Sequence, residues 1–266
     1  GPAIEYALKM RQFPQSQLLS DVQARGELSE AHIDALAKQI ADFHLQTPAV
    51  PSDHELCSPA AIVAPMRQNF EQIRPMLSDK ADLLQVDALE AWTESSFARL
   101  QPLLDQRAAN GSIRECHGDI HLGNATLLNG DVVLFDCIEF NEPFRLIDIA
   151  SDAAFLAMDL EDRDLKPLSR RFINAWLEHT GDYAALDLLN FYKAYRALVI
   201  TISPGPLVMP PRWECMNHSR YFGNAVWRAV RNLLGAGTLI FVLNLAAIPG
   251  MAAQVFGAAL IHSSLA

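Results

Sequence analysis

Nine residues near the middle of the chain bring together side chains that bind metal ions or carry protons. The stretch CHGDIHLGN, residues 116–124, contains two histidines, Asp119 and Asn124. The strand-like run DVVLFDCIEF begins at residue 131 and contains Asp136. An aspartate and an asparagine that present oxygens to one point suit Mg²⁺, a hard cation that keeps water and shares substrate phosphates. A further carboxylate beside them could accept a proton from a hydroxyl, so these are the residue types of a phosphoryl-transfer site.

A turn signal predicts that the separated members of this group meet. Asn129-Gly130 lies between the short segments ATLLNG and DVVLFDCIEF, and Asn-Gly favours a tight β-hairpin. Because a hairpin folds the chain back on itself, we expect Asp136 to return close to Asn124. Asp119 is then placed to act as a base beside a metal ion.

Helices are expected on both sides of the hairpin. Ser29 is a plausible N-cap for a helix whose apolar residues recur at helical spacing up to Phe43. Helices are also predicted over 65–107, with a break at Pro75, and over three stretches between 146 and 202. The second of these stretches is expected to end at Gly181, and its Phe172 and Trp176 are expected to face the core. The predicted fold class is therefore α+β, mainly helical, with one small hairpin that carries the polar cluster.

Composition limits the classes of function. The net charge of −10 over 266 residues argues against a nucleic-acid partner, because an acidic surface repels phosphates. The four cysteines are far apart and form no CxxC pair, so neither a zinc knuckle nor a disulfide framework is indicated. That pattern fits a reducing compartment, and we expect a cytoplasmic location.

The two ends of the chain differ in character from the rest. Gly1-Pro2 looks like the remnant of a cleaved purification tag, so we expect the native start to be missing. Residues 232–266 contain no Asp, Glu, Lys or Arg, and the apolar run 238–261 is long enough to span a bilayer. Pro249-Gly250 interrupts that run, so a buried helical hairpin is favoured over a membrane span.

The motif HGDIHLGN, with LFDCIEF and RLIDIASDAAFL after it, resembles the aminoglycoside phosphotransferase and choline-kinase-like family. That family shares the protein-kinase fold, and its catalytic loop reads HGDxxxxN. His117, Gly118, Asp119 and Asn124 match the loop. The resemblance implies a protein-kinase-like C-terminal lobe with a small hairpin at the catalytic loop.

The resemblance also implies roles for individual residues. Asp119 would be the catalytic base, and Asn124 and Asp136 would hold Mg²⁺ beside ATP. Asp148, in the sequence IDIASD, would brace the catalytic loop. We expect His117 to hold the loop by hydrogen bonds as well.

Four further interpretations concern residues to which the resemblance gives no defined role. His121 and Glu139 are candidates for substrate contact, with a solvated loop or strand end as the alternative for each. His44 is expected to be a packed or capping histidine. Five acidic residues after the hairpin are interpreted as a solvated face, with attraction of a cationic substrate as the alternative: Asp152, Asp159, Glu161, Asp162 and Asp164.

The resemblance covers the large lobe alone and predicts two parts. Residues 1–199 would form the lobe, with a hinge strand near 4–13, the catalytic loop at 117–124 and a metal-binding hairpin at 125–138. Residues 200–266 would be a divergent hydrophobic helical tail. EYALKMRQFP looks like the hinge of a subfamily in which the kinase-like domain precedes a P-loop ATPase domain, yet the chain contains no GxxxxGK[ST] motif.

These features predict an ATP-dependent phosphotransferase that acts on a small-molecule hydroxyl. Nothing before Lys9 could supply the phosphate-covering loop and the lysine of a small lobe, so we expect this chain to be weakly active or inactive and prone to self-association. A non-catalytic kinase-fold scaffold is the alternative. A metallophosphoesterase is disfavoured because Gly118-Asp119 and Gly123-Asn124 share one loop. An aminoglycoside, an amino sugar and a choline-like alcohol all remain open as the acceptor.

Overall fold

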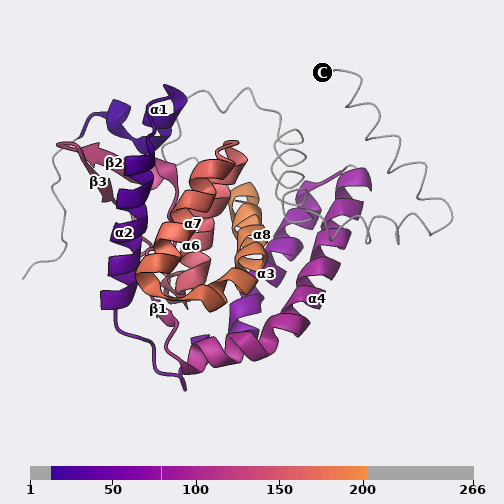
Figure 1. Ribbon diagram of the computed structural model, residues 1–266. Helices are drawn as coiled ribbons and strands as arrows, with labels where there is room; N and C mark the ends of the chain where they lie inside the picture. The colour runs from indigo at the N-terminus through magenta and orange to yellow at the C-terminus, as the bar shows by residue number, and fades with distance from the viewer. Residues whose placement is uncertain (1–12, 79, 203–266) are drawn as a thin grey trace, which may run out of the picture.

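The structure is a computed structural model that describes residues 13–78 and 80–202 (Figure 1). The predicted hinge strand near 4–13 lies almost wholly outside the described residues. The tail from residue 203 onward, which contains the apolar run 238–261, also lies outside them. Within the described ranges, every helix is too short or too polar to cross a membrane.

The described chain is mainly helical, as predicted. Its α-helices are α1 (Leu19–Ala24), α2 (Glu30–Gln46), α3 (Pro59–Ile73), α4 (Lys80–Ala109), α5 (Glu142–Arg145), α6 (Ile149–Asp162), α7 (Lys166–Thr180) and α8 (Leu186–Ile202). Short 3-10 turns occur between them, and one of these, Arg74–Met76, separates α3 from α4 at the break predicted from Pro75.

Local signals explain where the helices begin and end. Ser29 caps α2, because its side chain accepts a hydrogen bond from the backbone N–H of His32. Gly181 ends α7 in the left-handed conformation, with a φ of 71°. Both boundaries were predicted from the sequence.

Helix α6 lies at the centre of the helical core. It packs against α7 and α8, and α7 packs in turn against α2 (Figure 1). The long helices α3 and α4 lie on the far side of α8. Every residue of α6 from Ile149 to Leu160 is buried. Its neighbours contribute large side chains to the core, including Phe172 and Trp176 of α7, as predicted.

The β structure consists of two small antiparallel pairs. Strands β2 (Ala125–Leu128) and β3 (Asp131–Leu134) form the predicted hairpin, with both Asn129 (φ 55°) and Gly130 (φ 93°) in the left-handed region that its tight turn needs. The strand ends at Leu134, so the hairpin is shorter than the expected 125–138. Strands β1 (Ile113–Glu115) and β4 (Leu146–Asp148) form the second pair, which was not predicted.

The second pair brings the start of the catalytic loop to the start of α6. Strand β1 could not be predicted, because three residues are too few to give a period-2 pattern. Its partner strand leads directly into α6, and Ile113 lies opposite Asp148. The loop therefore begins on a strand that is fixed to the N-terminus of the central helix.

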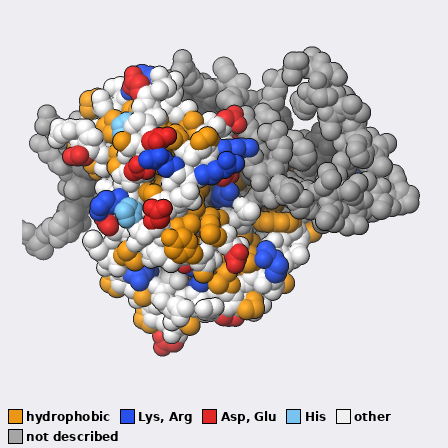
Figure 2. All heavy atoms as spheres, in the orientation of Figure 1, with side chains coloured by type: hydrophobic (Ala, Val, Ile, Leu, Met, Phe, Trp, Pro, Cys, Tyr) orange, Lys and Arg blue, Asp and Glu red, His pale blue; other side chains and the backbone are white. Residues whose placement is uncertain are grey.

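The surface carries charges of both signs. Figure 2 shows acidic and basic side chains interspersed on the same face as Figure 1, with hydrophobic side chains between them. Helices α2 and α7 are joined by such charges, since Arg171 of α7 pairs with Glu30 and Asp34 of α2. These pairs are exposed, so each one contributes little to stability.

Candidate active site

The predicted catalytic loop, residues 117–124, lies between β1 and β2 and ends in the 3-10 turn Leu122–Asn124. Asn124 is buried, and its Nδ2 donates to Asp119 Oδ2 at 3.0 Å and to the Asp119 carbonyl at 3.1 Å. The structure thus brings together Asp119 and Asn124, the two loop residues predicted to act as base and metal ligand. The Asn124 amide oxygen lies on the other side of the amide carbon, away from these two bonds.

Asp119 is a partly exposed carboxylate in a positive local field. Burial raises its pKa, but a contact with His121 and the nearby charges of Arg196 and His117 lower it more, so the net pKa lies below its usual value. His121 Nε2 is 3.6 Å from Asp119 Oδ2. Asp119 is therefore ionised at neutral pH and can orient a hydroxyl and accept its proton.

The segment that contains Asp136 is joined to the loop by three hydrogen bonds. The N–H of Phe135 donates to the Asn124 carbonyl at 3.1 Å, and the N–H of Ile138 donates to the His117 carbonyl at 2.9 Å. His117 Nε2 lies 2.9 Å from the Phe135 carbonyl. Asp136 is thereby held near the loop even though β3 has already ended.

Asp136 itself has an unusual backbone conformation. Its φ of 61° places it in the left-handed region, which residues other than glycine rarely adopt and which costs energy. Its side chain is exposed and free to meet a ligand. Glu139 is also exposed, and it makes no hydrogen bond to the loop among the described residues.

The hydrogen bonds of the two loop histidines fix their tautomers. The Asp119 N–H donates to His117 Nδ1 at 3.3 Å, and the Gly123 N–H donates to His121 Nδ1 at 3.0 Å. Each Nδ1 is an acceptor, so in the neutral ring the proton is on Nε2. The Nε2–H of His117 then donates to the Phe135 carbonyl, and that of His121 faces Asp119. His117 is thus bonded within the loop and to the Asp136 segment.

Two carboxylates of α6 accept hydrogen bonds from backbone N–H groups of the loop. Asp152 Oδ2 accepts from the His117 N–H at 3.1 Å and Asp152 Oδ1 accepts from the Gly118 N–H at 2.9 Å. Asp159 Oδ2 accepts from the Leu122 N–H at 2.9 Å. Residues seven apart lie on one face of a helix, so α6 holds both ends of the loop.

The interpretation of these acids as a solvated face was wrong for Asp152 and Asp159, which are both buried. The sequence carries a signal for this difference, because Asp152 and Asp159 are the only charged residues in the run from Ile149 to Leu160, which is otherwise apolar apart from Ser151. A carboxylate in such a run must find hydrogen-bond donors. Asp164, by contrast, is exposed as expected.

Asp148 makes a different set of contacts. Its carboxylate accepts two bonds from Arg107, both 2.7 Å long, one from Tyr192 at 3.2 Å and one from the Ala150 N–H at the start of α6. Arg107 also bonds to Asp182. The bonds that hold the loop come from Asp152 instead, and an effect of Asp148 on the loop stays a prediction.

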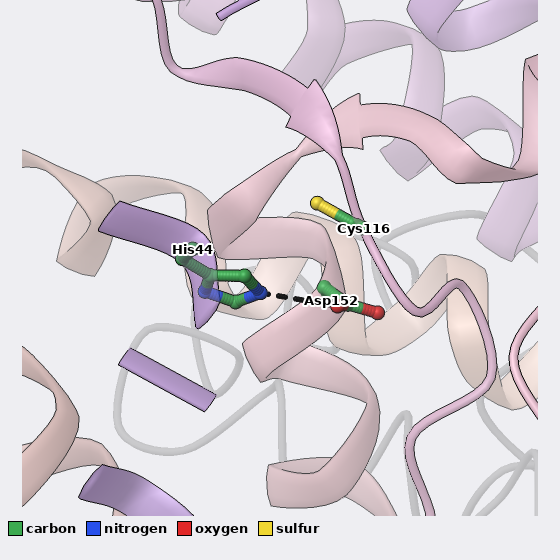
Figure 3. A group of neighbouring side chains, drawn as sticks. All are labelled: His44, Cys116 and Asp152. Carbon is green, nitrogen blue, oxygen red and sulfur yellow. Dashed lines mark hydrogen bonds and ion pairs between the residues drawn. The ribbon is translucent and has the colours of Figure 1, made fainter. Parts of the chain in front are cut away.

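The buried group of His44, Cys116 and Asp152 has the residue types of a metal site (Figure 3). Trp176 Nε1–H donates to His44 Nδ1 at 3.1 Å, and an indole nitrogen can only donate. His44 Nε2 must therefore carry the proton that faces Asp152 at 3.1 Å. Neither ring nitrogen retains a lone pair for a metal ion. His44 is a packed histidine, as predicted, that positions Asp152.

Burial also affects the pKa values of Cys116 and Asp152 in this group. Desolvation raises the pKa of the Cys116 thiol well above its usual value. It also raises the pKa of Asp152, but the bond from His44 and the charges of Arg196 and His117 outweigh it and lower the pKa overall. The Asp152 carboxylate is thus ionised and the thiol is not, as suits a hydrogen-bond acceptor for the loop.

Comparisons with known proteins identify the family of the chain. The chain is 28% identical over 234 residues to an uncharacterized protein of Mycobacterium bovis, and equally to uncharacterized proteins of two strains of Mycobacterium tuberculosis. Each match covers 88% of this chain but 45% of the relative, so the chain spans about half the length of these relatives. A sequence model of the phosphotransferase enzyme family matches residues 10–189. The chain belongs to the phosphotransferase enzyme family.

Proposed function

We propose that this protein transfers the γ-phosphoryl group of ATP to a hydroxyl of a small molecule, with Asp119 as the catalytic base. The observation that carries the proposal is the contact between Asn124 Nδ2 and Asp119 Oδ2. It fixes the direction of an ionised carboxylate within a loop that a buried helix holds. Family membership supports phosphotransferase chemistry in general, and the assignment to residues is ours.

In the proposed mechanism, Asp119 accepts a hydrogen bond from the acceptor hydroxyl and takes up its proton as the new bond to phosphorus forms. Asn124 keeps the Asp119 carboxylate in place through its amide N–H. His121 directs an Nε2–H towards the same carboxylate and contributes to its low pKa. The side chain of His121 is thus also near the expected position of the acceptor.

The residues present fit Mg²⁺ in the chemistry of their donor atoms. The Asn124 amide oxygen and the exposed Asp136 carboxylate are the oxygen ligands that this ion prefers, and three hydrogen bonds join the segments that carry them. Mg²⁺ bound with ATP would supply positive charge against the phosphates. Glu139, three residues after Asp136, is a weaker candidate for contact with the metal or the substrate.

A pair of substitutions tests the two roles separately. We expect Asp119→Asn to lower kcat by about 10²–10⁴-fold with little change in the affinity for Mg²⁺–ATP, because the base is lost and the nucleotide site is kept. Asp136→Ala should weaken Mg²⁺–ATP binding itself. Transfer assays with labelled ATP and titration calorimetry measure the two quantities. Turnover near that of the wild type in Asp119→Asn would remove Asp119 from the role of base.

The acceptor is a separate question. A panel of aminoglycosides, amino sugars and choline-like alcohols, each tested with labelled ATP, covers the classes that remain open. Clear binding of Mg²⁺–ATP without transfer to any hydroxyl would favour the alternative of a non-catalytic scaffold. The assays belong on the whole protein, since the chain spans 45% of the length of its relatives.

A further inference from the structure

Arg196 of α8 is a buried arginine beneath the catalytic loop. It is 3% exposed, and its guanidinium carbon lies 5.0 Å from the ring centre of Phe155 and 5.1 Å from that of Tyr195. Its position between two aromatic rings gives it favourable cation–π contacts and little freedom to move.

The hydrogen bonds of Arg196 end on backbone carbonyls. Nη1 donates to the Gly118 carbonyl at 2.9 Å, and Nε donates to the Ser151 carbonyl at 3.3 Å. Nη2 is buried and finds no partner among the described residues. Within those residues no carboxylate lies close enough to form an ion pair with Arg196, although its charge still acts on Asp119 and Asp152 at longer range.

This arrangement is poorly explained by stability alone. A buried charge without a close counter-ion is costly, and an apolar side chain of similar size between the two rings would avoid that cost. What an apolar side chain could not supply is the pair of hydrogen bonds. The bond to Gly118 is the shorter of the two, which indicates that Arg196 acts on the catalytic loop.

The Gly118 carbonyl belongs to the peptide bond that leads into Asp119. The N–H of the same peptide bond donates to His117 Nδ1 at the longer distance of 3.3 Å. Gly118 has a φ of 84°, and an added Cβ would come within 2.7 Å of the Phe144 carbonyl, so the position requires glycine. Because glycine is also the residue least restricted in backbone rotation, this peptide bond needs an external contact to hold its orientation.

We propose that Arg196 is a positioning residue of the transfer site: it fixes the plane of the peptide bond between Gly118 and Asp119, and with it the direction of the Asp119 carboxylate. Asp152 holds the N–H of Gly118 from α6, and Arg196 holds its carbonyl from α8. The last residue before the proposed base is thus held on both sides by buried charged groups. The catalytic consequence rests on the proposed function, whereas the effect on the peptide bond does not.

The direct test is the NMR spectrum of this chain in three variants. In Arg196→Met we expect a changed carbonyl ¹³C shift at Gly118 and a changed or broadened amide signal at Asp119. Arg196→Lys keeps a cationic donor and should restore part of the change. Arg107→Met is the matched control, since Arg107 is equally buried at 3% but bonds to Asp148 and Asp182; it should leave both signals in place.

Wild-type signals at Gly118 and Asp119 in Arg196→Met would overturn the proposal. If that variant does not fold, Arg196→Lys decides by the same signals, because its shorter donor group cannot reproduce the guanidinium geometry. Signals that stay at their wild-type positions in the lysine variant would then count against the proposal.

The kinetic test uses turnover per folded molecule in the whole protein. Arg196→Met should lower kcat by about 10–100-fold, as expected for a misplaced catalytic group, and Arg196→Lys should recover part of the loss. Arg107→Met should lower stability and keep kcat. Full turnover in Arg196→Met would contradict a positioning role. Absence of transfer in the wild type would instead count against the proposed function, and the NMR result would still decide the role of Arg196.

Discussion

Asp148 and Asp152 lie one helical turn apart at the start of α6, are both buried, and hold different parts of the molecule. Asp148 pairs with Arg107, which also bonds to Asp182, so this network joins α4, α6 and the approach to α8. Asp152 accepts instead from His44 and from two backbone N–H groups of the catalytic loop. The first network connects framework elements, and the second connects the framework to the site.

The difference lies in the kind of donor. An arginine forms a bidentate ion pair with a carboxylate, which fixes two rigid elements relative to each other. Buried backbone N–H groups must find an acceptor, so a carboxylate that accepts two of them helps to determine the shape of the loop. The same residue type therefore supports the framework at position 148 and the site geometry at position 152.

The largest effect that this comparison predicts is for Asp152→Ala. The substitution leaves the Nε2–H of His44 and the N–H groups of His117 and Gly118 without an acceptor. We expect the free energy of unfolding to fall by about 3–5 kcal/mol. Urea denaturation measures it. A loss below about 1 kcal/mol would mean that water or another group replaces Asp152, and the comparison would fail.

Asp148→Asn should have a smaller effect. Arg107 keeps its bonds to Asp182, so one of two partners is lost, and we expect a decrease of about 1.5–3 kcal/mol in the free energy of unfolding. The exposed pair partner Arg171 provides a baseline, because Arg171→Ala should cost less than about 1 kcal/mol. A loss in Asp148→Asn no greater than that of Arg171→Ala would show that the Arg107 network is unimportant for the framework.

The smallest effect concerns the pH dependence of stability. Because the pKa of Asp152 is lower in the folded protein than the usual 3.8, the unfolded chain binds its proton more readily. Its contribution is therefore complete above pH 3.8 and is lost as the pH falls through the folded pKa. Asp152→Asn should show a shallower decline of unfolding free energy in acid than the wild type. Equal slopes in the two proteins would contradict the lowered pKa.

Features that depend on neighbouring residues were predictable from the sequence. The cap at Ser29, the end of α7 at Gly181 and the turn at Asn129-Gly130 each follow from a few adjacent residues. The proximity of Asp119 and Asn124 was also expected, because both residues belong to one loop motif, whereas the hydrogen bond between their side chains was not.

Features that depend on tertiary contacts were harder to predict. The pairing of β1 with β4 joins two three-residue strands more than thirty positions apart, and neither has a pattern of its own. The roles of Asp152 and Arg196 depend on which face of a helix meets the loop. An acidic residue in an apolar run indicates that a partner exists, but the sequence alone could not identify the His117 and Gly118 amides as that partner.

Hydrogen exchange of the loop amides tests most directly the claim that Asp152, and not Asp148, holds the catalytic loop. Asp152→Asn keeps the size of the side chain but replaces one acceptor oxygen by a donor. We expect faster exchange at His117 or Gly118 in this variant and wild-type exchange at both amides in Asp148→Asn, under conditions where both variants are folded. Unchanged exchange at His117 and Gly118 in Asp152→Asn, or faster exchange there in Asp148→Asn, would contradict it.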